Sequence, residues 1–458
     1  MTPAGLPERV AILGFARSGR ALAAALLSRG VAVSVGDDKP ESAFEGVEAM
    51  RSAGVTFQFG GAAEALLEGA GWLVLSPGVP MTAPLVAKAR ERGVPVLAEL
   101  EVAWRIAEAE AEGKNRWVAV TGTNGKSTTT SWIAHILRRD GRPVALAGNI
   151  GVPLSEFLAE RRPRDFVCEV SSFQLEGIAR FRPQVAVLTN VTPDHLDRYP
   201  DFAEYLAAKE RVFENQDQGD VAVVNADDAA ASRANTGKAR RVLFSRRAVC
   251  PGGAWVESGA IVSEVGGPRR PILPSSDVAL SGAHNLENAL AALAAAQAAG
   301  ASDEAVAEGL RRFHGLPHRC ELVLEQSGVR WINDSKGTNV DAAAKSLEGF
   351  PEGRVLLILG GRDKHGDFPS LVSAVRRAAR LVLTIGEAAG VIEEALAGAV
   401  PFERAETMDR AVARARELAR SGDTVLLSPA CASFDQYKNF EERGRHFASL
   451  VRQVAPDA

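Results

Sequence analysis

The sequence predicts an α/β fold with mostly parallel sheets, divided among three domains. Short runs of β-branched residues alternate almost throughout with Ala- and Leu-rich stretches of helical period, which is typical of strands joined by helices. A chain of 458 residues also exceeds one ordinary hydrophobic core, so several domains are expected. Shifts in composition place these domains at residues 1–105, 106–315 and 316–458.

Apolar runs bounded by turn residues predict the strands of each domain. In the first domain they cover residues 9–13, 31–35, 72–75 and 94–97. The second domain has predicted strands at 117–120, 166–170 and 185–188, then short strands and loops over 246–274. In the third domain they cover 331–332, 355–359, 381–385 and 424–427. The polar residues 108–115 are predicted to form the linker between the first two domains.

The composition is typical of a soluble, cytoplasmic globular protein. Apolar residues make up 46% of the chain and charged residues 24%. A net charge of −4 gives no electrostatic reason to expect nucleic acid as a partner. The four cysteines are widely spaced and form no C-x-x-C pair, which fits reduced thiols. Residues 1–9 have no basic segment leading into an apolar one, so we expect no signal peptide. No apolar run reaches membrane-spanning length, so we expect no membrane insertion.

The clearest motif is the run TGTNGKST at residues 121–128, which follows a predicted strand and opens a helix. Glycines allow backbone N–H groups to surround phosphate oxygens, and the amino end of a helix favours negative charge. Two residues separate its glycines where the full P-loop pattern has four, so a plain polar turn remains the alternative. Lys126 would reach the β- and γ-phosphates, and Ser127 would offer its hydroxyl to Mg²⁺. The predicted nucleotide site consists of Gly122, Thr123, Asn124, Gly125, Lys126, Ser127 and Thr128.

Two further motifs follow strands of the second domain. Glu169 ends one strand, and His195 lies in the run DHLD at residues 194–197 after the next. Parallel strands deliver their carboxyl ends to one edge of a sheet, so both side chains are candidate Mg²⁺ ligands. From the residues alone, His195 also fits a turn or capping role. Lys209, in a helical pattern shortly afterwards, fits an ordinary surface position.

The first domain carries an imperfect dinucleotide fingerprint. The run GFARSG at residues 14–19 follows a strand, and Asp37 closes the next strand. Ala16 replaces the second glycine, which normally lets a pyrophosphate approach the backbone. The pattern still suits a diphosphate-bearing ligand, with a purely structural strand–turn–helix as the alternative. The candidate substrate-binding residues here are Gly14, Phe15, Asp37 and Ser76.

Polar clusters also follow strands later in the chain. HNLEN at 284–288 precedes an Ala-rich helix, and PHR at 317–319 lies at a predicted domain boundary. In the third domain, NDSKGTN at 333–339, GGRDK at 360–364 and SPACASFD at 428–435 each follow a strand. Polar clusters at three strand ends predict one pocket, although any one of them alone fits a capped turn.

Taken in order, the motifs GTNGKS, EVSSFQL, DHLD, HNLEN, PHR, NDSKGTN and SPACASFD resemble the Mur ligases, and the resemblance covers nearly the whole chain. It implies a Rossmann-like domain for UDP, a central P-loop ATPase domain and a C-terminal domain that receives an amino acid. It also implies ATP and Mg²⁺ as cofactors, with two metal sites.

The resemblance assigns roles to individual residues. The implied catalytic residues are Lys126, His195, Lys209 and Arg319. The implied metal ligands are Ser127, Glu169, His195 and Lys209, of which Lys209 matches the lysine that is carbamylated in the family. A carbamate requires a neutral amine, and hence a lowered pKa. The further implied nucleotide contacts are Asn285, Asn288, Arg319 and Asp334. Asn149 would contact the UDP-linked substrate, and the amino acid would be held by Thr338, Lys364, Ser433 and Phe440.

The acceptor residues resemble those of family members that join D-glutamate to UDP-N-acetylmuramoyl-L-alanine in peptidoglycan precursor synthesis. Lys364 and two hydroxyls suit a side-chain carboxylate. That activity implies an acyl phosphate and a tetrahedral intermediate, and we expect a monomer. The alternatives are another Mur or folylpolyglutamate-type ligase with a different acceptor, an NAD-dependent oxidoreductase, and a non-catalytic ATP-driven switch.

Overall fold

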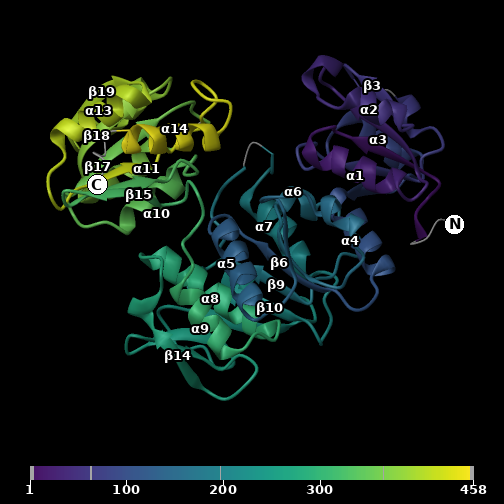
Figure 1. Ribbon diagram of the computed structural model, residues 1–458, viewed down its shortest axis with the longest axis horizontal. Coiled ribbons are helices and arrows are strands. Elements are labelled where there is room, and N and C mark those ends of the chain that lie inside the picture. The colour runs from purple at the N-terminus through teal and green to yellow at the C-terminus, as the bar shows by residue number, and fades with distance from the viewer. Residues whose placement is uncertain (1–4, 62–63, 196–197, 365, 454–458) are drawn as a thin grey trace. The chain divides into compact units, whose positions relative to one another are not determined.

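A computed structural model describes residues 5–61, 64–195, 198–364 and 366–453 and contains three sheets with helices packed against them (Figure 1). The expected α/β class with mostly parallel strands is confirmed. The chain divides into two compact units. One holds the chain up to Val278 together with Glu287–Phe313, and the other holds Ala279–Leu286 and the chain from His314. The predicted boundaries after residues 105 and 315 remain predictions.

The first sheet is fully parallel and has the strand order β3-β2-β1-β4-β5. Its strands are β1 (Arg9–Leu13), β2 (Ala32–Asp37), β3 (Thr56–Phe59), β4 (Trp72–Leu75) and β5 (Val96–Ala98). Four residues of β1 are buried in succession, because helices cover both faces of a parallel sheet. The helices here are α1 (Arg17–Leu27), α2 (Val47–Ser52), α3 (Pro84–Glu91) and α4 (Glu99–Glu110). The order reverses between β1 and β4, so the loops after these two strands flank a switch point where ligands bind in such sheets.

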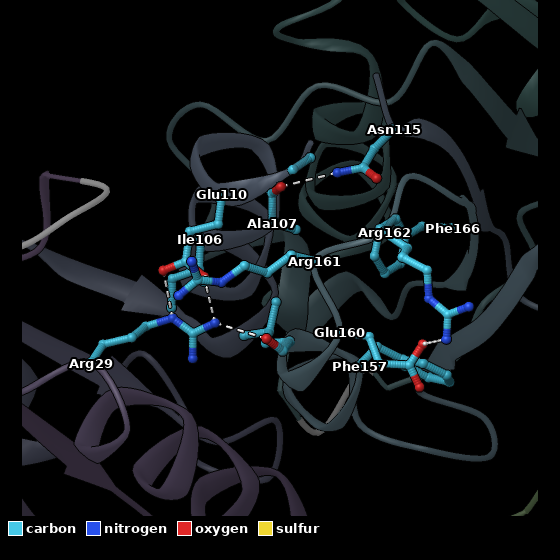
Figure 2. A pocket seen from close by; sticks show the side chains of 12 residues that line it. Arg29, Ile106, Ala107, Glu110, Asn115, Phe157, Glu160, Arg161, Arg162 and Phe166 are labelled. Carbon is cyan, nitrogen blue, oxygen red and sulfur yellow. Dashed lines mark hydrogen bonds and ion pairs between the residues drawn. The ribbon is translucent and has the colours of Figure 1, made fainter. Parts of the chain in front are cut away.

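The predicted linker at 108–115 is wrong in its first three residues, because α4 continues to Glu110. Glu110 forms an almost fully buried ion pair with Arg29 (2.7 Å; Figure 2). Arg29 also donates to the carbonyl of Leu158 (2.8 Å). Beyond the helix, the Asn115 amide donates back to the carbonyl of Ala107 (3.0 Å; Figure 2). Polar residues suggested an exposed connection. Instead, the side chains of Glu110 and Asn115 are buried and bond to neighbouring segments, since buried polar groups need hydrogen-bond partners.

The second sheet has nine strands in the order β14-β13-β12-β11-β10-β9-β6-β8-β7. Its parallel strands are β6 (Arg116–Thr121), β7 (Val144–Gly148), β8 (Asp165–Glu169), β9 (Val185–Leu188), β10 (Val221–Asn225) and β11 (Arg240–Ser245). The predicted short strands at 246–274 are confirmed as β12 (Ala254–Glu257), β13 (Ala260–Ser263) and β14 (Arg270–Pro274). The helices of this region are α5 (Lys126–Arg139), α6 (Ser172–Leu175), α7 (Phe202–Glu210), α8 (Ala283–Ala298) and α9 (Asp303–Arg311). β6 lies between β8 and β9, so the loops after all three strands share one edge.

The third sheet has the order β15-β16-β20-β17-β18-β19, and only β15 is antiparallel to its neighbour. Its strands are β15 (Glu321–Gln326), β16 (Val329–Asn333), β17 (Val355–Gly360), β18 (Ala379–Ile385), β19 (Phe402–Glu406) and β20 (Thr424–Leu427). The helices are α10 (Val340–Glu348), α11 (Phe368–Ala378), α12 (Ala389–Leu396), α13 (Met408–Leu418) and α14 (Phe440–Arg452). β16, β20 and β17 are neighbours, which places the three predicted polar clusters at one edge. None of the helices described in the chain is long and apolar enough to cross a membrane.

Candidate active site

The loop between β6 and α5 is hydrogen-bonded to the loop that follows β9. The Thr123 N–H donates to the Asn190 carbonyl (2.9 Å), and the Asn124 N–H donates to Asn190 Oδ1 (2.9 Å). Thr189 Oγ1 in turn donates to the Asn124 carbonyl (2.7 Å). Thr189 and Asn190 therefore fix the predicted nucleotide loop from outside. Sequence reasoning did not single out these contacts, although both residues directly follow a predicted strand of the same sheet.

Glycine is required twice in this loop. Gly122 has a φ of +143°, and Gly125, which precedes α5, has a φ of +80°. A Cβ on Gly122 would clash with Thr189 Oγ1, and one on Gly125 would clash with Asn288 Oδ1. The two positions combine a left-handed backbone with a close neighbour, so the loop keeps its shape only without side chains there.

We expect Gly125→Ala to reduce ATP turnover at least tenfold, because Asn288 and the loop must both shift. Gly141→Ala is the matched control, since Gly141 has a similar φ of +75° and no atom within 4 Å of the added Cβ. Both substitutions cost about 1 kcal/mol of backbone strain. Phosphate release and thermal unfolding of the two variants separate the local clash from the strain. Equal turnover in both variants would show that the close contact between Gly125 and Asn288 does not determine the shape of the loop.

The structure brings Ser127, Glu169 and Asn149 together beside this loop. Ser127 Oγ contacts Glu169 Oε2, and Asn149 Nδ2 donates to Glu169 Oε1 (2.7 Å). Glu169 is buried at the end of β8, whereas Asn149 is exposed after β7. A carboxylate and a hydroxyl are the oxygen ligands that Mg²⁺ prefers, so this pair fits such an ion. Lys126 Nζ donates to the Thr123 carbonyl (2.6 Å), which holds the amine against the loop.

His195 has a left-handed backbone and lies near the aromatic residues of this region. Its φ is +55°, and its ring centroid is 4.9 Å from that of Phe173 and 6.2 Å from that of Tyr205. Within the described ranges, no three His, Cys, Asp or Glu side chains are gathered as a metal site. The metal-binding role of His195 therefore stays a prediction, and Asp197 of the same motif lies outside the described residues.

Lys209 is buried, so its interpretation as an ordinary surface lysine is wrong. Only 2% of the residue is exposed, and Nζ donates to the Gly122 carbonyl (2.7 Å) and lies 4.4 Å from the ring centroid of Tyr205. Burial, followed by the nearby charge of Lys126, lowers its pKa well below the usual value. A signal was available in the sequence, because Lys209 follows Tyr205 by one helical turn and shares its inward face.

In the first sheet, the predicted substrate-binding residues bond to one another. The Phe15 N–H donates to Asp37 Oδ2 (2.8 Å), and Ser76 Oγ donates to the Gly14 carbonyl (2.8 Å). The ring of Phe15 is buried and stacks edge-on against Phe57 (centroids 5.0 Å apart). The four residues thus build the loop at the switch point, and their contacts with substrate stay predictions.

The second compact unit holds the other predicted nucleotide and amino-acid residues, except Asn288. The Ala430 N–H donates to the Gly337 carbonyl (2.9 Å), and Arg362 and Ala432 exchange backbone bonds (2.9 and 3.0 Å). Arg443, only 1% exposed, donates to the carbonyls of Ser335 (2.9 Å) and Cys431 (3.1 Å). The three predicted polar clusters are therefore tied into one edge. This edge carries the half-buried Thr338, exposed Lys364, buried Ser433 and half-buried Phe440.

The remaining predicted nucleotide residues lie in both units. Asn288 accepts a bond from Thr129 Oγ1 (3.3 Å) in the first unit, and Asn285 Nδ2 donates to the Ser281 carbonyl (2.8 Å) in the second. Asp334 accepts bonds from Ser428 Oγ (2.8 Å) and the Cys320 N–H (3.2 Å), and burial raises its pKa to about 6. Arg319, next to Cys320, also belongs to the second unit. The nucleotide-binding roles of these four residues stay predictions.

Three family models match consecutive parts of the chain. Residues 8–98 match the Mur ligase MurD-like N-terminal domain, 120–296 the Mur ligase middle domain, and 318–431 the Mur ligase glutamate ligase domain. Two solved structures share the fold at low sequence identity. A UDP-N-acetylmuramate–alanine ligase from Thermotoga maritima has a TM-score of 0.62 and 20% identity, covering 98% of this chain and all of that one. A pseudomurein peptide ligase type C from Methanothermus fervidus has a TM-score of 0.60 and 19% identity over the same shares.

Sequence relatives match at much higher identity. A UDP-N-acetylmuramoylalanine–D-glutamate ligase from Pelotomaculum thermopropionicum is 45% identical over 97% of both chains. A ligase of the same name from Acidobacterium capsulatum is 44% identical over 97% of this chain and 96% of its own. With three matching family models and near-complete alignments of this kind, the chain belongs to the Mur ligase family.

Proposed function

We propose that this chain joins D-glutamate to UDP-N-acetylmuramoyl-L-alanine, with ATP as the energy source, in peptidoglycan precursor synthesis. The observation that carries the proposal is the glycine-shaped loop of Lys126 with two buried groups, Glu169 and Lys209, set against it. Ligases with this activity in their names align with the chain from end to end. We also propose a cytoplasmic, monomeric enzyme.

The chemistry begins with activation of a carboxylate, because a carboxylate and an ammonium group do not condense in water. An oxygen of the L-alanyl carboxylate attacks the γ-phosphorus of ATP. The bond from this phosphorus to the β,γ-bridging oxygen breaks, so ADP leaves and an acyl phosphate forms. Lys126, at the start of α5, stabilises the charge on the transferring phosphoryl group. The amine of D-glutamate, after losing a proton, attacks the acyl carbon, and the tetrahedral intermediate expels phosphate to leave the amide.

Mur ligases use ATP and Mg²⁺. Ser127 and Glu169 would hold one Mg²⁺, which neutralises phosphate charge when bound. Glu169, His195 and a carbamylated Lys209 would hold a second. The lowered pKa of Lys209 supports this assignment, since only a neutral amine reacts with CO₂ and burial makes that form accessible.

The amino acid would be held at the edge of the third sheet. Lys364 is exposed there and provides a cation for a carboxylate, while Ser433 and Thr338 provide hydroxyls on the neighbouring loops. Phe440 begins α14, and Lys336 Nζ lies 3.9 Å from its ring centroid. Two cations near the same edge suit an acceptor with two carboxylates, as D-glutamate has.

Product identity tests the proposal. The purified protein is incubated with ATP, Mg²⁺ and UDP-N-acetylmuramoyl-L-alanine plus D-glutamate, L-glutamate, L-alanine or L-lysine, and phosphate and the product mass are measured. We expect one new amide, from D-glutamate only, with one phosphate per product. A parallel incubation replaces the UDP-linked substrate with a folate. Amide formation from L-glutamate and the folate, with none from D-glutamate, would favour the folylpolyglutamate-type alternative instead.

A further inference from the structure

An open groove lies between α14 and the segment that leads into β15. Its volume is about 670 Å³, which is within the range of small-molecule sites. Arg445, Ser449 and Arg452 line it from α14, and His318 and Glu321 line it from the other side. All of these residues belong to the second compact unit. The groove shares no residue with the predicted nucleotide loop or with the predicted amino-acid contacts at the edge of the third sheet.

The two arginines of the groove are exposed and form no ion pair within the part of the chain that the structure describes. By contrast, Arg414 on α13 of the same unit pairs with Glu403 (2.7 Å). Two helical turns, or roughly 10 Å along the axis of α14, separate Arg445 from Arg452. The wall therefore presents two separate cations that no ion pair neutralises.

His318 adds a hydrogen-bond donor to this wall. The residue is only 9% exposed, and its Nδ1 lies 2.9 Å from Asn333 Nδ2. Asn333 Oδ1 accepts a bond from the Ser335 N–H (3.2 Å), which agrees with an amide nitrogen facing the ring. Because an amide nitrogen only donates, Nδ1 accepts, and the ring hydrogen is on Nε2. Burial lowers the pKa of His318, so at pH 7 the ring is neutral, and Nε2 is a donor without an acceptor among the described residues.

The position of this donor is fixed by its neighbours. His318 has a left-handed backbone with a φ of +65°, and a Cβ on Gly444 of α14 would clash with its ring. Oε2 of Glu321 accepts bonds from the His318 N–H (2.8 Å) and from Asn333 Nδ2 (3.2 Å), so this oxygen is engaged by the protein. A fixed donor beside two flexible cations suits an anion with many oxygens and more than one negative group. Phosphate groups fit best, because guanidinium binds them in a bidentate manner.

We propose that this groove binds a small molecule with two or more phosphate groups, at a site separate from the nucleotide and amino-acid sites. Arg445 and Arg452 each bind one phosphate group, and His318 Nε2 donates to an oxygen of the same ligand. The ligand thereby joins α14 to the segment that leads into β15. The inference does not depend on the ligase activity, because it rests on the groove and its charges alone.

The test measures the modification of individual arginines by phenylglyoxal, mapped by peptide mass spectrometry, with tripolyphosphate as the probe. A bound phosphate chain shields the guanidinium groups that it contacts. We therefore expect the probe, at about ten times its Kd, to slow the modification of Arg445 and Arg452 roughly tenfold in the unmodified protein. Arg376 is the matched control, since it is an exposed arginine on α11 of the same unit and should react at an unchanged rate. Inorganic phosphate, which has a single group, should protect both groove arginines less than tripolyphosphate does.

Two variants locate the bound probe. Arg452→Ala should raise the Kd for the protection of Arg445 about tenfold, because one charge-assisted contact is lost. Lys126→Ala should leave that protection unchanged, since the phosphate loop is not part of the groove. Thermal unfolding checks that both variants fold.

Three results would overturn the inference. Equal slowing at Arg376 would show that the phosphate acts on all exposed arginines. Unchanged reactivity of Arg445 and Arg452, or an unchanged Kd in Arg452→Ala, would show that the two cations do not share a ligand. Loss of the protection in Lys126→Ala would assign it to the phosphate loop.

Discussion

Lys126→Ala is expected to lower kcat for amide formation by roughly 10³-fold, the upper range for removing one group that stabilises transition-state charge. The lysine begins α5 directly after Gly125, where the amino end of the helix already favours phosphate, and its ammonium adds the mobile charge that follows the transferring phosphoryl group. Phosphate release and product formation are measured together at saturating ATP.

The matched control for this prediction is Lys114→Ala, which removes an exposed lysine just before β6 and leaves the loop intact. It should retain normal turnover and melting temperature. Lys126→Arg is a second comparison, because arginine keeps the charge but not the compact shape of the ammonium. Near-normal turnover by Lys126→Ala would remove the phosphate loop from the mechanism.

Lys209→Ala and Lys209→Met are both expected to abolish amide formation, since neither side chain accepts CO₂. The two differ in space: alanine leaves a cavity beside Gly122, whereas methionine fills it. Formate or acetate should therefore restore part of the activity of Lys209→Ala by occupying that cavity, and should leave Lys209→Met inactive. Activity of Lys209→Ala that stays high and insensitive to short carboxylates would contradict the carbamate.

Lys209 is required for the proposed activity, but its buried amine lowers the free energy of unfolding at neutral pH. The folded-state pKa of Lys209 is lowered, so between that pKa and its usual value near 10.5 the unfolded chain binds more protons than the folded one. The free energy of unfolding of the unmodified protein, prepared without bicarbonate, therefore rises with pH across this window. We expect Lys209→Met to be more stable than the unmodified protein at neutral pH, with an advantage that shrinks towards pH 10. Urea unfolding at pH 7 and 9.5 measures the difference.

Prediction from the sequence succeeded where one strong local pattern decides the structure. The strands β1, β4, β9 and β20 have the predicted bounds, because compact runs of apolar residues with clear turns mark them. The strands β3, β7, β10, β11, β15 and β19 were missed. β3 (TFQF) and β19 (FERAE) are short and partly exposed, so they lack a continuous apolar run. Their pairing with β2 and β18 forms them, and that pairing is not a local property.

In the candidate site, too, some features follow from local sequence and others depend on tertiary contacts. Glycine spacing and the strand before it predict the phosphate loop, since a left-handed backbone and a helix start are local features. The sequence by itself determined the α/β class, the motifs and their order. Only the tertiary structure decided that Lys209 is buried against Gly122, that Glu110 pairs with Arg29, and that His318 lines a groove beside α14. Burial and charge pairing depend on contacts between segments that are far apart in sequence, and local sequence patterns do not encode those contacts.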